Sequence, residues 1–290
     1  MKRYIIGLGE ALWDMLPEGK KIGGAPANFA YHAGQWGMPS MVVSAVGRDA
    51  LGKETLETFD KIGLSYLMEY VDNPTGTVGV TLDDKGVPKY EIYRDVAYDN
   101  MSYTPVMDEI ARNCRAVCFG TLAQRSPLSH ETISHFLRVV PDDALRIFDI
   151  NLRQDFYSVE LIKESLGRCD ILKINDEEIK LVANMFGYNE TDMEAISRKI
   201  LRNFRLKMLV LTCGTDGSYV FSQDGEISFL PTPKVKVADT VGAGDSFTGT
   251  FCASLLKGMS IPEAHALAVK VSAFVCTQEG AMPKYDQSFI

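Results

Sequence analysis

Short, continuous apolar runs recur along the chain, and longer amphipathic stretches separate them. Strands without polar alternation are typical of a parallel sheet that is buried on both faces. Strand–helix–strand order connects such strands by right-handed crossovers. We therefore predict an α/β fold, a three-layer α/β/α sandwich with a mostly parallel central sheet. The predicted strands are Tyr4–Leu8, Met41–Val46, Ala116–Phe119, Arg146–Ile150, Ile171–Ile174 and Met208–Leu211.

Helix-start signals lie in the segments between these strands. At three places a serine or threonine precedes a proline or a glutamate, in the pattern of an N-cap or a capping box. These places begin at Ser126, Thr191 and Ser260, and we expect the second helix to end near Phe204. The signals support the alternation of strands and helices that the sandwich requires.

Two pairs of β-rich segments interrupt this alternation. Each pair flanks a short turn sequence, which predicts a β-hairpin. The first hairpin, with its turn at 83–86, fits either a small β lid over the body or an edge of the main sheet. The pairs are Thr77–Leu82 with Lys89–Arg94, and Ser218–Phe221 with Ile227–Leu230.

The composition restricts the class of protein. The chain has 290 residues, of which 46% are hydrophobic, and a formal net charge of −8. The apolar content excludes global disorder, and the acidic balance disfavours a nucleic-acid surface. No apolar run approaches the roughly 20 residues of a membrane-spanning helix, and the N-terminus does not resemble a signal peptide. The six cysteines form no C-x-x-C pair, so we expect reduced thiols in a cytoplasmic enzyme.

A glycine-rich segment at 239–247 is the strongest local signal. It precedes a helical stretch that Gly258 would end, so Gly242 and Gly244 would lie at a helix N-terminus. The first N–H groups of a helix lack intrahelical partners and carry about half a positive charge, which suits a phosphate. Asp245 fits a general base that takes a proton from an attacking hydroxyl. The structural alternative is that Asp245 only stabilises the first helical turn.

Three further segments carry residues that suit ligands. Gly24 and Asn28 lie in a small-residue stretch that leads into a helix, where Asn28 could bind a polyol as donor and acceptor. Asn175 and Glu178 follow a predicted strand and suit phosphate and water-bound Mg²⁺. The segment 212–217 also follows a strand, and ligands of α/β sheets lie beyond such strand ends. Tight turns and helix capping remain the structural alternatives.

Other nucleotide motifs fail in this sequence. Gly47–Lys53 has the spacing of a phosphate-binding loop, but Glu54 stands where a Ser or Thr binds Mg²⁺. Gly7 and Gly9 are followed by Leu12 instead of the third small residue of a dinucleotide fingerprint. The patterns H-E-x-x-H and G-x-S-x-G are also missing from the sequence. Dinucleotide, zinc and serine-hydrolase functions are therefore disfavoured.

Taken together, these segments resemble the ribokinase-like, pfkB-type carbohydrate kinases. The resemblance extends from Ile5 to Pro283, and the opening Gly-Glu-Ala-Leu-Trp-Asp at 9–14 is similar to the fructokinases of that family. Four family motifs occur in the family's order. They are Gly-Gly-x-x-x-Asn at 23–28, Asn-x-x-Glu at 175–178, Thr-x-Gly-x-x-Gly at 212–217 and Asp-Thr-x-Gly-Ala-Gly-Asp-x-Phe at 239–247.

The resemblance implies one ribokinase-like kinase domain over residues 1–290. In such kinases a small β-sheet lid covers the α/β/α body, and the lid segments here would be about 10–23 and 75–103. The sugar would lie between lid and sheet, with ATP and Mg²⁺ nearby. In several relatives two lids interlock, which makes a homodimer through the lid an option for this chain.

The resemblance also assigns roles by position. Asp245 is the catalytic base, and the backbone of Gly242, Ala243 and Gly244 forms the anion hole. The sugar-binding candidates are Asp14, Gly24 and Asn28, followed by Arg94 and Arg153, for which a surface salt bridge is an equal alternative. The nucleotide-binding candidates are Asn175, Glu178, Thr212, Gly214 and Gly217, with Glu178 reaching Mg²⁺ through water. A K⁺ site is implied at Asp239 and the carbonyls of Val241, Val275 and Gly280.

We therefore expect an ATP-dependent kinase that phosphorylates a primary hydroxyl of a small sugar, with the 6-hydroxyl of D-fructose the first choice. One alternative is a kinase for ribose, 2-keto-3-deoxygluconate or a nucleoside, whose base could lie against Trp13, Tyr90 or Tyr93. The other alternative is a non-catalytic sugar-binding regulator. Retention of the glycines and of Asp245 favours the kinase.

Overall fold

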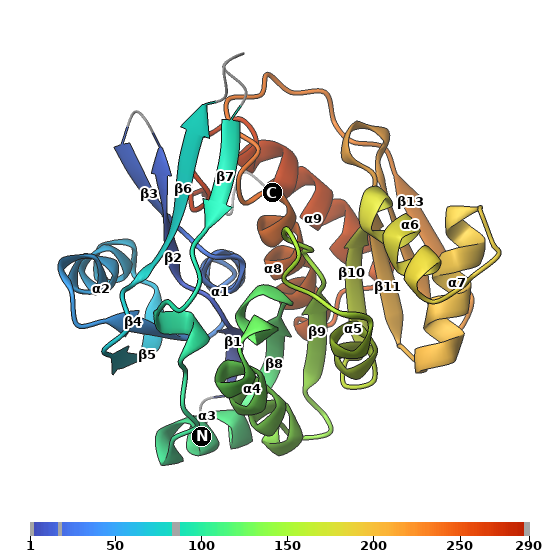
Figure 1. The fold of residues 1–290 in the computed structure, drawn as a ribbon. Helices are drawn as coiled ribbons and strands as arrows, with labels where there is room; N and C mark the ends of the chain where they lie inside the picture. The colour runs from blue at the N-terminus through green and yellow to red at the C-terminus, as the bar shows by residue number, and fades with distance from the viewer. Residues whose placement is uncertain (1–2, 17–18, 83–87, 287–290) are drawn as a thin grey trace.

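A nine-stranded sheet forms the centre of the computed structural model, which describes residues 3–16, 19–82 and 88–286 (Figure 1). The strand order is β13-β12-β11-β10-β9-β8-β1-β4-β5. From β11 to β5 all neighbours are parallel, and β12 and β13 add an antiparallel hairpin at one edge. The strands are β1 Tyr4–Leu8, β4 Ser40–Gly47, β5 Ser65–Val71, β8 Cys114–Phe119, β9 Leu145–Asp149, β10 Ile171–Asn175, β11 Met208–Thr212, β12 Ser218–Ser222 and β13 Ile227–Leu230.

All six predicted strands occur in this sheet, which confirms the predicted fold class; the one predicted at 146–150 is a residue out of step with β9. Alternate side chains of each strand enter cores on opposite faces. Ile5 and Ile171 lie in one buried cluster, whereas their neighbours Ile6 and Leu172 lie in the other. A sheet buried on both faces explains why its strands have no polar alternation. The edge strand β5 was not predicted, because most of its side chains are only half-buried and several are polar.

Helices cover both faces of the sheet (Figure 1). The core of one face includes residues of α1, α8 and α9, and α2 packs on the same side near β4. The core of the other face includes residues of α3 to α7. The helices are α1 Ala25–Gly34, α2 Ala50–Ile62, α3 Pro105–Arg112, α4 Pro127–Val139, α5 Val159–Leu166, α6 Asp176–Met185, α7 Met193–Phe204, α8 Ala243–Leu256 and α9 Ile261–Val275.

The predicted helix starts are largely confirmed. Ser126 is the N-cap of α4, and Ser260 forms a capping box at the start of α9. The prediction at Thr191 was wrong by one residue. Asp192 is the N-cap of α7 and accepts the backbone N–H of Ala195 at 2.9 Å, because its carboxylate is a stronger acceptor than a threonine hydroxyl.

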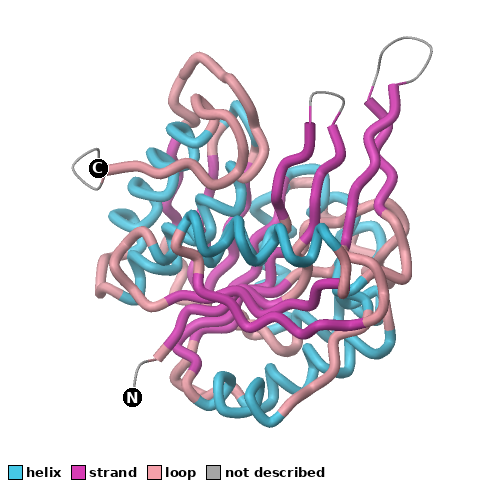
Figure 2. The backbone as a smooth tube through the Cα atoms, turned by 90° about the vertical axis from the view of Figure 1, so that its left-hand side faces the viewer, coloured by secondary structure: helices cyan, strands magenta, loops and turns pink. Residues whose placement is uncertain are grey.

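A second, four-stranded sheet stands beside the main one, in the order β3-β2-β6-β7. In Figure 2 its strands rise from the body as two hairpins. This resolves the choice left open for the first predicted hairpin, which belongs to a separate sheet, whereas the second extends the main sheet. The turn predicted at 83–86 lies outside the described residues. The strands are β2 Leu12–Leu16, β3 Gly19–Gly23, β6 Gly76–Leu82 and β7 Pro88–Ile92.

Two properties expected from composition can be compared with the structure. No helix in the described ranges is both long and apolar enough to cross a membrane. All six cysteines lie in those ranges and are unpaired, and five of them are buried. The expectation of free thiols is confirmed.

Candidate active site

The N-terminus of α8 lies in the middle of the candidate site. Gly242 is its N-cap with φ +78°, a conformation that favours glycine. A Cβ atom on Gly242 would lie 2.7 Å from the side chain of Ala281, and one on Gly244 would lie 3.0 Å from Nζ of Lys173. Both glycines therefore allow close packing at the start of α8. The first N–H groups of α8 have no partners within the helix.

Asp245 lies in the first turn of α8. Its Oδ2 accepts a hydrogen bond of 2.7 Å from Nδ2 of Asn28, on the adjacent helix α1. Burial raises the pKa of Asp245 to about 6, and the charge of Asp149 adds to the rise. The bond from Asn28 and the charges of Lys173 and Arg153 oppose the rise. A carboxylate in this state can accept a proton near neutral pH.

Asn28 links the start of the chain to Asp245. Its Oδ1 atom is buried and has no hydrogen-bond partner among the described residues, so it remains available to a ligand hydroxyl. The preceding Gly24 has φ +110°, and a Cβ there would lie 2.4 Å from the carbonyl oxygen of Glu10. Gly24 thus brings the start of α1 against the segment that carries Glu10.

Two further carboxyl groups, like Asp245, are affected by the charge of Arg153. Burial raises the pKa of Glu10 to about 7, and Asp245 adds to this rise while Arg153 opposes it. Burial also raises the pKa of Asp14, again opposed first by Arg153. Oε2 of Glu10 is buried without a partner in the described part of the chain. Arg153 is exposed and forms no ion pair with a described residue, so its charge is available to a ligand among these carboxyls.

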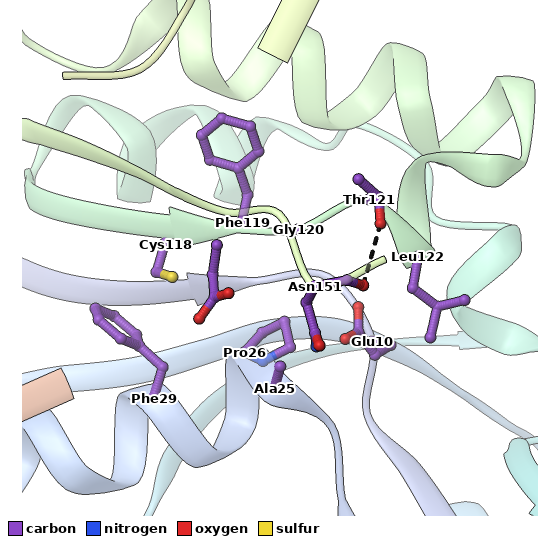
Figure 3. A pocket seen from close by; sticks show the side chains of 11 residues that line it. Glu10, Ala25, Pro26, Phe29, Cys118, Phe119, Gly120, Thr121, Leu122 and Asn151 are labelled. Atoms are coloured by element: carbon purple, nitrogen blue, oxygen red, sulfur yellow. Dashed lines mark hydrogen bonds between the residues drawn. The ribbon is translucent and has the colours of Figure 1, made fainter. Parts of the chain in front are cut away.

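A small cavity of about 10 Å³ lies beside Glu10 (Figure 3). This volume holds about one water molecule. Figure 3 shows Glu10 next to Asn151, whose backbone carbonyl accepts from the Thr121 hydroxyl at 3.4 Å. Asn151 has φ +40°, a strained value for a residue with a side chain. Asn151, in the loop after β9, lines this cavity together with Glu10.

Strands β9 and β10 carry a buried ion pair beside the first turn of α8. Nζ of Lys173 lies 3.1 Å from Oδ1 of Asp149, and both side chains are at least nine-tenths buried. Oδ2 of Asp149 accepts a 3.3 Å hydrogen bond from the hydroxyl of Thr248 in α8. Burial disfavours the charge of Lys173, but Asp149, Glu178 and Asp245 outweigh it, so the pKa of Lys173 is raised.

The predicted nucleotide residues meet at the same sheet edge, because Asn175 and Thr212 are paired in the register of β10 and β11. Asn175 and Glu178 form the capping box of α6. The Glu178 carboxylate accepts the N–H of Asn175 at 2.9 Å and that of Leu152 at 2.8 Å. Burial raises the pKa of Glu178, while Lys173 lowers it. Each carboxylate oxygen retains a lone pair for a water molecule.

The glycines after β11 shape a tight loop. Gly214 and Gly217 have φ +51° and +129°. A Cβ on Gly217 would lie 2.5 Å from the carbonyl oxygen of Leu230, so β13 packs directly on this loop. The carbonyl of Gly214 accepts the hydroxyl of Thr232. Through this bond the loop after β11 contacts the segment between β13 and α8.

The remaining predicted residues are Arg94 and those of the implied K⁺ site. Arg94 lies beyond the end of β7, although the predicted strand included it, and pairs with exposed Asp155 at 3.2 Å. This is the salt-bridge alternative. The two oxygens of Asp239 accept the N–H groups of Val241 and Gly280. The carbonyl of Val275 accepts the N–H of Gln278 at 3.0 Å.

The structure therefore brings together the residues of four sequence segments and adds three that were not predicted as site residues. In the sequence, Glu10 belongs to the family motif at 9–14, and Asp149 and Lys173 belong to predicted apolar strands. A charged residue inside an otherwise apolar strand was the available signal, because such a residue is rarely buried without a partner. In the described ranges no group of three or more His, Cys, Asp or Glu side chains could hold a metal ion.

Proteins of known family resemble this chain in sequence. The sequence profile of the family described as pfkB family carbohydrate kinase matches residues 18–287. A putative sugar kinase of Pyrococcus horikoshii is 27% identical, over 98% of this chain and 94% of its own. An ATP-dependent 6-phosphofructokinase of Thermoanaerobacterium thermosaccharolyticum is 29% identical, over 97% and 90%. A fructokinase of Rhizobium leguminosarum bv. trifolii is 28% identical, over 87% and 79%.

Solved structures share the fold. A fructokinase of Xylella fastidiosa with bound ATP superposes with a TM-score of 0.84 at 22% identity, over 97% of this chain and 94% of its own. A putative ribokinase of E. coli in complex with ATP and Mg²⁺ has a TM-score of 0.83 at 20% identity, over 97% and 95%. These values confirm the sandwich with its additional small sheet.

Proposed function

The chain belongs to the pfkB family of carbohydrate kinases, and we propose that it transfers the γ-phosphoryl group of ATP to a primary hydroxyl of a small sugar. The observation that carries the proposal is Asp245, a partly buried carboxylate at the N-terminus of α8 that is held by Asn28. A base in this position can take the hydroxyl proton while the sugar oxygen attacks phosphorus. The neighbouring N–H groups can receive the charge of the phosphoryl oxygens.

In the proposed step the only bond that the protein forms is to the proton that Asp245 receives. The sugar oxygen forms a bond to the γ-phosphorus, the bond to the β–γ bridging oxygen breaks, and the hydroxyl proton passes to Asp245. The N–H groups near Gly242, Ala243 and Gly244 stabilise the transferred group. Mg²⁺ supplies charge neutralisation on the phosphate oxygens when bound. Glu178 has the remaining lone pairs to hold it through water.

D-Fructose, phosphorylated at its 6-hydroxyl, is the substrate that we propose first. Relatives named fructokinase support it, and the segment with Glu10 and Asp14 resembles fructokinases. Other relatives are named 6-phosphofructokinase and 5-dehydro-2-deoxygluconokinase, so sugars of related shape are the alternatives. A nucleoside is less favoured, because the Trp13 ring is buried and donates to Thr55 at 2.9 Å instead of lining an open slot.

A coupled assay of ADP release tests this function. Fructose, fructose 6-phosphate, 5-dehydro-2-deoxygluconate, ribose, 2-keto-3-deoxygluconate, glucose and adenosine are compared with ATP and Mg²⁺. Turnover on fructose above all others supports the full proposal. Turnover on another member keeps the mechanism and corrects the sugar, while binding without turnover on any member favours the sugar-binding regulator.

The pH profile of kcat/KM gives a first prediction. Asp245 accepts a proton only when ionised, so activity should fall as pH drops through about 6. The charged groups that face Asp245 are Glu10, Asp149, Lys173 and Arg153. The pKa of Glu10, about 7, is close enough to that of Asp245 to broaden the acid side of the pH profile. The measurement is kcat/KM from about pH 4 to pH 8 at constant ionic strength. Undiminished activity near pH 4, the ordinary range of a carboxyl, would contradict the assignment.

Asp14 gives a second prediction. Its carboxylate can accept from two vicinal hydroxyls, so Asp14→Ala should raise the sugar KM by about tenfold or more, the effect of losing charged hydrogen bonds. The ATP KM should stay unchanged. Glu91→Ala is the matched control, because Glu91 is an exposed acid on the same small sheet. Equal sugar KM values for Asp14→Ala and wild type would remove Asp14 from the sugar site.

Two expectations about cation and assembly are also proposals. We propose a K⁺ site at Asp239, Val241, Val275 and Gly280, supported by the hydrogen bonds through which Asp239 joins the segment before α8 to the segment after α9. Replacing K⁺ by a larger organic cation in the assay tests it. We also propose that the small sheet acts as a lid and pairs two copies, and sedimentation of the purified protein tests the dimer.

A further inference from the structure

A buried lysine under the site has no task in the mechanism so far. Lys173 interrupts the apolar run of β10, between strands β9 and β11 in the main sheet. Its side chain is 10% exposed. A buried ammonium group is costly unless it is paired, so its retention in the sheet needs a reason.

Asp149 pairs with the ammonium group of Lys173 but does not saturate it. An ammonium group has three N–H donors. One donates to Oδ1 of Asp149 at 3.1 Å, and no second acceptor lies within hydrogen-bond distance among the described residues. Two donors are therefore free for a ligand.

The free donors lie beside the anion hole. A Cβ built on Gly244 would be 3.0 Å from Nζ of Lys173, so the ammonium group lies directly against the first turn of α8. Asp245 is the next residue, and the charge of Lys173 acts on it. The group thus borders the space between the proposed base and the N–H groups of the helix.

We propose that Lys173 binds the non-bridging oxygens of the phosphoryl group during its transfer, with Asp149 as the residue that positions it. This inference rests on the proposed function of Asp245. Lys173 keeps its protons throughout, because the sugar proton passes to Asp245 and the leaving oxygen remains on ADP. A fixed cation that meets charge developing in the transition state accelerates the step.

The charges around Lys173 define a second consequence. Asp149 on β9, Glu178 on α6 and Asp245 on α8 all face its ammonium group, while Glu10 and Arg153 also face Asp245. Removing the lysine takes away a cation that favours ionised Asp245. In the single variant Lys173→Met the acid limb of kcat/KM should then move to higher pH, whereas loss of Asp149, whose charge raises the pKa of Asp245, acts in the opposite direction.

The main test is the double variant Lys173→Met with Asp149→Asn, because the single lysine change would leave a buried carboxylate without its cation. We expect a folded protein with kcat lowered about 10²–10³-fold, the usual cost of losing one such donor. Affinity for a non-hydrolysable ATP analogue should fall about tenfold while ADP affinity is unchanged. Lys199→Met is the control, since Lys199 forms an ion pair with Glu190 outside the site.

A folded double variant with wild-type kcat and an unchanged ratio of analogue to ADP affinity would overturn the proposal. Should the double variant fail to fold, the wild-type protein provides the test. The side-chain NMR resonance of Lys173 should shift with the analogue and sugar together but not with ADP, and equal spectra would overturn it. The analogue and ADP titrations need no turnover, so they separate this inference from a failure of the proposed sugar kinase activity.

Discussion

Asp245→Asn should lower kcat by about 10²–10⁴-fold, the contribution expected of a general base. Asparagine keeps the size of the side chain and an oxygen for the bond from Asn28, so the site geometry is preserved. It cannot take up the hydroxyl proton. Affinities for sugar and ATP should stay within about threefold of wild type, because the loss occurs in the transition state. Full activity in the variant would refute the role of Asp245.

The same substitution should stabilise the protein at neutral pH. The folded state raises the pKa of Asp245 from 3.8 to about 6, so its ionisation costs about 3 kcal/mol of stability as pH rises through this interval. Asparagine has no charge to desolvate. The Tm of Asp245→Asn should exceed that of wild type at pH 7.5, and the difference should shrink toward pH 4. A lower Tm at pH 7.5 would show that the ionised carboxylate is well compensated in the fold.

Gly242→Ala should also lower kcat strongly. Its φ of +78° strains an alanine by about 1–2 kcal/mol, and the new methyl group would lie 2.7 Å from the side chain of Ala281. Ala281 cannot move freely, because its carbonyl pairs with Nε2 of buried His32 at 2.8 Å. The loop must therefore shift, and the N–H groups of the anion hole shift with it. We expect kcat to fall about 10²-fold or more.

Gly258→Ala is the matched control for this change. Gly258 follows the other end of α8 with φ +86°, and no atom lies within 4 Å of a Cβ built on it. The control carries the backbone strain without the contact, so it should lose about 1–2 kcal/mol of stability at unchanged kcat. Thermal melts and kcat of both variants provide the comparison. Equal kcat in the two variants would show that the methyl contact at 242 does not matter to the chemistry.

Much of this fold could be predicted because each layer has its own sequence pattern. The apolar run at Ile171–Ile174 predicts a buried strand, and the serine caps before α4 and α9 predict helix starts. The edge strand β5 has no such pattern, since half-buried positions accept polar side chains. In the small sheet, β6 and β7 were predicted from their turn sequence, whereas β2 and β3 were expected from the family resemblance alone.

The sequence predicted those residues of the candidate site that lie within a recognisable motif. Asp245 and the glycines stand in a local pattern whose chemistry can be read from the residue types. The contacts of Asp245 could not be found this way, because Asn28, Asp149 and Lys173 meet it only in the folded chain. A hydrogen bond across 217 residues of sequence has no local signal.

The pairing of α1 with α8 also has a consequence for synthesis of the chain. Phe29 and Ala33 of α1 share a core cluster with Phe247 and Phe251 of α8, and a Cβ on Gly249 would lie 2.7 Å from the backbone of Phe29. A ribosome adding about 5–20 residues per second needs about 10–40 s to travel from one helix to the other. During that time the apolar face of α1 has left the ribosome without its partner. Chaperone dependence of the newborn chain should therefore be concentrated in its first helix.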